Sequence, residues 1–213
     1  MTSLQFYFDP ACPWAWLTSL WIREARLHRP LEIEWKFFSL AEVNELDPAR
    51  AGMLRIAAQA RREGGNEAVD GAYLGLGRMT HERRERYGTL DELRQIAPGA
   101  LQEVGLDPAL AQRALDDETT MDDVLADHRE AVDKLDAFGV PWIVLQDGTK
   151  GFFGPVVGEV PRGDKATELW DHFEWISSQP SLFELKRGRA SLPKLQGLSA
   201  DYLPQGVESG GAT

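Results

Sequence analysis

The chain contains a single cysteine, Cys12, whose thiol is the side chain best suited to nucleophilic chemistry. An ionised thiol attacks a disulfide or another electrophile. Three residues later, where a second cysteine could close an intramolecular disulfide, the chain has Ala15. We therefore expect a one-thiol site, whose mixed disulfide must be resolved by a thiol from solution. The surrounding segment reads Phe8-Asp9-Pro10-Ala11-Cys12-Pro13-Trp14-Ala15-Trp16.

The residues on either side of Cys12 predict a strand before it and a helix after it. Residues 4–8 alternate as a strand does, and residues 13–27 carry apolar side chains at three- and four-residue spacing. Pro13 suits the first turn of a helix. Cys12 would then lie at a helix N-terminus, where the dipole lowers the pKa of a thiol, although less so without a second thiol at position 15. The alternative is a buried structural thiol, the usual state of a free cysteine.

A second candidate feature is Gly139-Val140-Pro141, which follows a helical pattern and begins a strand. A trans bond before Pro141 is the ordinary arrangement at a strand start. A further strand pair, 142–146 and 150–153, flanks the turn signal Asp147-Gly148.

The remaining periodicity predicts the order β-α-β, a helical block, then α-β-β-α. Residues 31–40 form the second strand, and the long helix before them implies a parallel crossover. In the block, a capping box begins at Thr89 and its helix ends at Pro98. A later helix places Val132 and Phe138 on its inner face, and Asp164 caps the last helix. We expect an α/β fold: a sheet domain from 1–44 and 128–190, a helical insertion at 45–127, and a partly disordered tail at 191–213.

The composition excludes several classes of function. A net charge of −11 disfavours nucleic-acid and anionic-membrane surfaces, which need a concentrated positive field. The N-terminal residues lack the pattern of a secretory signal, and no stretch is long and apolar enough to span a membrane. One cysteine and four histidines without ligand spacing predict no metal site. We expect a cytoplasmic protein and leave open whether it forms a homodimer.

These motifs resemble the DsbA-like branch of the thioredoxin superfamily, and most of all the mycothiol-dependent nitroreductases of actinobacteria. The most specific blocks are Gly151-Phe152-Phe153-Gly154-Pro155 and Val160-Pro161-Arg162-Gly163. The other residues that carry the resemblance are residues 8–14, Trp16, Trp21, residues 39–41, Asn44, Tyr73, Gly77, His81, residues 139–141, residues 169–171 and residues 183–187.

The resemblance implies a thioredoxin-like sheet with a helical insertion and a thiol–disulfide oxidoreductase. Mycothiol, or a glutathione-like thiol, would be a co-substrate, with no tightly bound cofactor. A cis-proline, here Pro141, would face the catalytic Cys12. The residues implied to bind the thiol or substrate are Pro13, Trp14, Ala15, Asn44, His81, Val140 and Pro141.

Three matters stay open at this stage. Family members carry Cys-Pro-Trp-Cys, so Ala15 marks either a natural one-thiol protein or an engineered replacement of cysteine. A kappa-class-like thiol transferase or isomerase, or a non-catalytic binding relative, are the competing functions. Asn44 has a helix cap as its alternative role, and His81 a solvated helical face.

Overall fold

The computed structural model describes residues 1–145 and 151–204. Within these residues no helix is long and apolar enough to cross a membrane. The chain forms two compact units, which are described separately. The first comprises Met1–Phe38 and Asp127–Leu195, and the second Ser39–Ala126 with the chain from Gln196 on.

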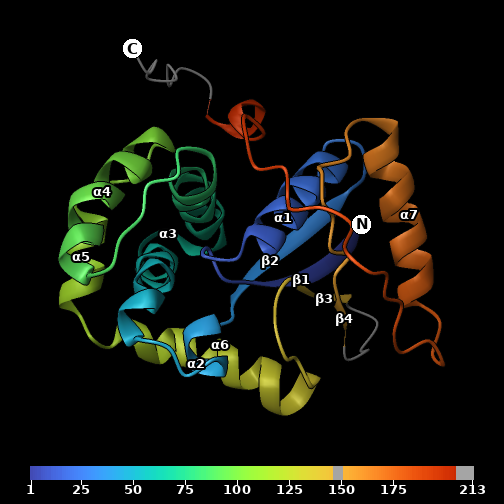
Figure 1. Ribbon diagram of the computed structural model, residues 1–213, viewed down its shortest axis with the longest axis horizontal. Coiled ribbons are helices and arrows are strands. Elements are labelled where there is room, and N and C mark those ends of the chain that lie inside the picture. The colour runs from blue at the N-terminus through green and yellow to red at the C-terminus, as the bar shows by residue number, and fades with distance from the viewer. Residues whose placement is uncertain (146–150, 205–213) are drawn as a thin grey trace. The chain divides into compact units, whose positions relative to one another are not determined.

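The first unit contains a four-stranded sheet with the order β2-β1-β3-β4 (Figure 1). β1 and β2 are parallel, as the predicted β-α-β crossover requires, while β3 runs antiparallel to both β1 and β4. The Asp147-Gly148 turn lies outside the described residues. The bounds of the strands are Thr2–Phe8 for β1, Leu31–Phe37 for β2, Trp142–Leu145 for β3 and Phe152–Phe153 for β4.

Two helices of this unit, α1 (Pro13–Arg26) and α7 (Asp164–Ser177), pack side by side (Figure 1). The contact centres on Trp21, which is fully buried and donates its indole N–H to the carbonyl of Ala166 at 3.0 Å. The rings of Trp170 and Phe173 lie 6.2 Å from it. A tryptophan buried with its N–H paired combines a large apolar area with a satisfied donor, so this contact positions α1 firmly.

The block Val160-Pro161-Arg162-Gly163 joins the start of α7 to α1. The carboxylate of Glu24, which is buried on α1, accepts from Arg162 at 2.9 Å and from the Gly163 N–H at 3.0 Å. Gly163 is the N-cap of α7 with a φ of 54°, which favours glycine. The prediction that Asp164 caps α7 was wrong: Asp164 is the first helical residue, and α7 has no side-chain cap.

The second unit is helical in its described part. Thr89 forms the predicted capping box with Glu92 at the start of α4. The helix α4 does not end at Pro98 but continues to Glu103, because Ala97, Ala100 and Leu101 are fully buried and their packing offsets the hydrogen bond that proline lacks. The helices are α2 (Leu40–Val43), η1 (Pro48–Ala51), α3 (Gly52–Gly77), η2 (Arg78–Glu82), α4 (Leu90–Glu103), α5 (Leu110–Asp116) and η3 (Ala200–Tyr202).

Close packing within the second unit depends on glycine at one position of α3. A Cβ atom on Gly75 would lie 2.3 Å from the carbonyl oxygen of Ala100, which leaves no room for any side chain between α3 and α4. The helix α3 also bends at Gly65, whose φ of 67° is not helical.

The helix α6 (Thr120–Leu135) begins in the second unit and ends in the first. Its predicted inner face was wrong at two residues: Val132 is 38% exposed and Phe138 is 65% exposed. Asp136 adopts a φ of 59°, so the helix stops before Phe138 and helical spacing no longer applies to it. Ala131, the residue before Val132, is fully buried.

Candidate active site

Cys12 is the N-cap of α1, which places its sulfur at the first turn of that helix. Its backbone is extended, with φ −84° and ψ 113°, and its Sγ accepts from the Ala15 N–H at 3.5 Å. A tight turn supports this position, since the Cys12 N–H donates to the carbonyl of Asp9 at 2.9 Å. The Asp9 carboxylate in turn accepts from the Ala11 N–H at 2.9 Å. The turn between β1 and α1 therefore fixes the direction of the thiol.

The Val140-Pro141 segment lies directly against the thiol. The Sγ of Cys12 is 3.7 Å from the carbonyl oxygen of Val140, and the Val140–Pro141 peptide bond is cis. The carbonyl of Pro141 accepts from the Gly154 N–H at 2.9 Å, which ties this segment to the end of β4. The structure thus brings together residues that are 128 positions apart in the sequence.

The environment of the sulfur favours the protonated thiol. Cys12 is only 7% exposed, and burial raises its pKa above the ordinary value for cysteine. Hydrogen bonds from the N–H groups of Ala15 and Trp14 lower the pKa, the carboxylate of Asp9 raises it, and Arg189 lowers it. The expectation that the helix N-terminus would lower this pKa was therefore wrong in its net direction, because desolvation of the anion outweighs the donors.

The other predicted residues of this loop lie around the sulfur. Ala15 is fully buried on the first turn of α1, and Pro13 and Trp14 are half-buried. The guanidinium carbon of Arg189 lies 4.5 Å from the centre of the Trp14 ring. Arg189 was not predicted as a site residue, because it lies in an irregular segment after α7 where no periodicity predicts contacts.

Asn44 and His81 belong to the second unit. Asn44 is the C-cap of α2, and its side-chain amide donates to the carbonyl of Leu40 at 2.8 Å, so the capping alternative describes its observed contact. His81 lies on η2, a π-helical turn, and is only 2% exposed. The alternative of a solvated helical face therefore does not apply to His81.

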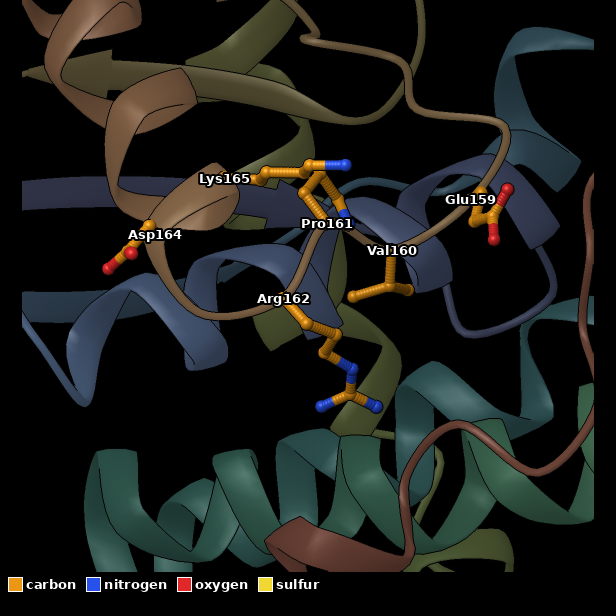
Figure 2. A pocket seen from close by; sticks show the side chains of 6 residues that line it. All are labelled: Glu159, Val160, Pro161, Arg162, Asp164 and Lys165. Carbon is orange, nitrogen blue, oxygen red and sulfur yellow. The ribbon is translucent and has the colours of Figure 1, made fainter.

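A pocket at the start of α7 contains none of the predicted site residues. Figure 2 shows the charged side chains of Arg162, Asp164 and Lys165 pointing in different directions rather than converging on one point. Arg162 is moreover engaged by Glu24. Among the residues that the structure describes, no cluster of histidine, cysteine and carboxylate side chains could hold a metal ion.

This sheet order, with a cysteine at the N-terminus of the crossover helix and a cis-proline loop against it, is that of a thioredoxin-like fold. The probable DsbA oxidoreductase SCO1869 of Streptomyces coelicolor has the same fold, with a TM-score of 0.54 at 21% identity over 89% of this chain and 95% of that one. The cytosolic disulfide reductase DsbM of Pseudomonas aeruginosa gives a TM-score of 0.57 at 15% identity, over 82% and 99% of the two chains.

The sequence comparisons narrow this class to one family. The model of the Rv2466c-like family, described as mycothiol-dependent nitroreductase, matches residues 11–187. The protein Rv2286c of Mycobacterium tuberculosis is 36% identical over 200 residues, which cover 89% of this chain and 84% of that protein. The chain therefore belongs to the Rv2466c-like family, and both the suspected family and the predicted α/β, thioredoxin-like fold class are confirmed.

Proposed function

We propose that this protein is a thiol–disulfide oxidoreductase that works with one nucleophilic cysteine, Cys12, and a low-molecular-weight thiol, mycothiol first of all. The observation that carries the proposal is the contact of 3.7 Å between the Cys12 sulfur and the Val140 carbonyl, at the N-terminus of α1. Membership of a family described as mycothiol-dependent supports the choice of thiol.

The reaction proceeds by two thiol–disulfide exchanges. The Cys12 thiolate attacks a mixed disulfide, forms a new S–S bond to one half and releases the other half as a thiolate. A second molecule of the low-molecular-weight thiol, as its thiolate, then attacks this bond, forms a soluble disulfide and returns the electron pair to Cys12. Every sulfur oxidised in one step is matched by one reduced, and no second protein cysteine takes part.

The remaining predicted residues take supporting roles in this proposal. Val140 and Pro141 hold the incoming thiol alongside Cys12, and Pro13 and Trp14 shape the opening of the site. Asn44 and His81 contribute to binding of the thiol or substrate. We also propose that the protein acts in the cytoplasm, and the likeness of its fold to that of the cytosolic disulfide reductase DsbM supports this.

Intact-mass measurement after incubation with oxidised mycothiol, or with oxidised glutathione, tests the proposal. We expect one thiol adduct per chain that forms faster at pH 9 than at pH 7, that a reductant removes, and that Cys12→Ser does not form. The measurement at pH 9 is required because burial raises the pKa of the Cys12 thiol. A folded protein that forms no adduct at either pH would overturn the proposal.

Ala15 favours one competing function, a kappa-class-like thiol transferase or isomerase. Such an enzyme activates a bound thiol for attack on an electrophile and needs no dithiol. The two functions separate in a conjugation assay with an electrophilic aromatic substrate and free thiol, since a transferase would keep its activity in Cys12→Ser. If the protein showed neither activity, and if its cellular role survived alkylation of Cys12, it would be a non-catalytic protein that binds a partner or substrate.

A further inference from the structure

The side chain of Arg189 stacks on an aromatic ring that belongs to the same helix turn as Cys12. Its guanidinium lies over the indole of Trp14, 4.5 Å from the ring centre, and Trp14 is two residues from Cys12 in the first turn of α1. The face of an indole ring attracts a guanidinium, so the ring limits the positions available to the charge. Arg189 itself is solvent-exposed.

The segment that carries Arg189 is anchored beyond it. This segment, residues 178–195, has no regular structure and follows α7. At its end, the Lys194 N–H donates to the carbonyl of Gly158 at 3.0 Å, and the Lys194 ammonium pairs with Glu159 at 2.6 Å. The backbone is therefore attached to the first unit five residues after Arg189.

No hydrogen bond or ion pair joins Arg189 to any other residue in the described part of the chain. Two arginines of the first unit differ in this respect. Arg29 forms a two-pronged pair with Asp171, and Arg162 pairs with Glu24. Arg189 is thus a cation that no described carboxylate neutralises, and its charge acts on Cys12, the single thiol of the chain.

We propose that Arg189, stacked on Trp14, is a positioning residue whose charge stabilises negative charge on the Cys12 sulfur. This inference rests on the proposed function, in which the sulfur is anionic twice. It is a thiolate when it attacks the mixed disulfide, and it becomes a thiolate again when the resolving thiol breaks the Cys12–S bond and the electron pair returns to it. A nearby cation favours both states.

The other groups that act on the sulfur set the size of the effect. Asp9, in the turn after β1, opposes the thiolate, and the N–H groups of Ala15 and Trp14 favour it. The Val140 carbonyl contacts the sulfur from the proline loop and carries no charge. Burial and Asp9 raise the pKa of Cys12, and Arg189 is the cation that lowers it. Solvent weakens the effect of Arg189, because its side chain is exposed.

The rate of Cys12 alkylation by iodoacetamide, measured from pH 6 to pH 10, tests this role without a disulfide substrate. We expect Arg189→Gln to lower the rate at neutral pH about threefold and to shift the profile to higher pH, the size expected of a screened opposite charge. Arg189→Lys should keep most of the rate. Arg187→Gln, an exposed arginine in the same segment, is the matched control and should leave the profile unchanged.

Ionic strength supplies a second readout. In about 1 M salt, where the Debye length is near 3 Å, the difference between Arg189→Gln and the unchanged protein should largely disappear. A profile for Arg189→Gln that coincides with that of the unchanged protein at low salt, or that shifts equally in Arg187→Gln, would overturn the inference. Alkylation remains measurable even if no mixed disulfide forms, so failure of the proposed function and failure of this inference give different results.

Discussion

The sulfur of Cys12 lies 3.7 Å from the carbonyl oxygen of Val140, which precedes Pro141. A carbonyl oxygen accepts a hydrogen bond, so this contact suits a protonated thiol better than a thiolate. The geometry places the nucleophile where an incoming sulfur can be aligned, while burial keeps much of it protonated at neutral pH. Alignment and ionisation are thus separate properties of this site.

The first prediction concerns the pH dependence of Cys12. Because burial raises its folded-state pKa, the thiolate fraction is small near neutral pH and increases as the pH rises through that pKa. The alkylation rate should keep rising above about pH 8.5, where an unperturbed cysteine is half ionised. An unstructured peptide with one cysteine and blocked ends, titrated in parallel, is the reference. A plateau reached at lower pH than that of the reference would contradict the prediction.

The second prediction concerns stability at alkaline pH. Tyr7 and Cys12 both have pKa values raised in the folded protein, above all by burial and, for Tyr7, also by the nearby Glu130. The unfolded chain therefore releases these protons first as the pH rises, and it binds fewer protons than the folded chain. The free energy of unfolding should decrease with increasing pH above the unfolded pKa values.

Urea unfolding at about pH 8 and pH 10.5 measures this decrease. Tyr7→Phe removes one of the two titrating groups, so its free energy of unfolding should fall less between the two pH values than that of the unchanged protein. His172→Gln, an exposed change on α7, should leave the decrease unaltered. If the free energy of unfolding fell equally in Tyr7→Phe and in the unchanged protein, ionisation of Tyr7 would not contribute to the loss of stability.

The third prediction concerns Ala15→Cys. The Ala15 N–H donates to the Cys12 sulfur at 3.5 Å, so a thiol at position 15 would stand one turn from it on α1. Mild oxidation should then close an intramolecular disulfide, seen as loss of two hydrogens in the intact mass and of both free thiols. The variant should also reduce nitro compounds with mycothiol, whereas the chain with Ala15 should do so weakly or not at all.

A matched control is Ala25→Cys. Ala25 is fully buried on the same helix, and at 1.5 Å per residue it lies about 15 Å further along α1, too far for a disulfide with Cys12. This variant should keep two free thiols after the same oxidation. Strong nitro-compound reduction by the chain with Ala15 would mean that both electrons are delivered without a second protein thiol.

The sequence predicted the elements around the site because their spacing is regular. Pro13 marked the start of α1, and alternation marked β1 and β2, so the place of Cys12 at a helix N-terminus followed directly. Pro98 was misleading, since burial on both sides of it holds α4 together.

The three-dimensional contacts of the site could not be predicted from the sequence, for physical reasons. The stacking of Arg189 on Trp14 joins an irregular segment to a helix start, and irregular segments carry no period from which a partner can be deduced. The direction of the Cys12 pKa depends on the balance between helix N–H donors and desolvation, and the extent of burial became known only from the fold.

The fourth prediction concerns Glu24, whose carboxylate accepts from both Arg162 and the Gly163 N–H. Glu24→Ala removes both acceptors at a buried position and leaves the start of α7 without its link to α1. The free energy of unfolding should fall by about 2 kcal/mol, the usual cost of leaving buried donors without an acceptor. Arg162 contributes less to this loss than a fully buried donor would, because it is partly exposed.

Glu159→Ala is the matched control for this change, because Glu159 also pairs with a cation, Lys194, but at an exposed position. Exposed pairs contribute little, so its urea midpoint should hardly move. The Cys12 alkylation profile should stay the same in Glu24→Ala if the Glu24 contacts serve only the scaffold. Equal loss of stability in the two variants would mean that the contacts of Arg162 and Gly163 with Glu24 do not hold α7 against α1.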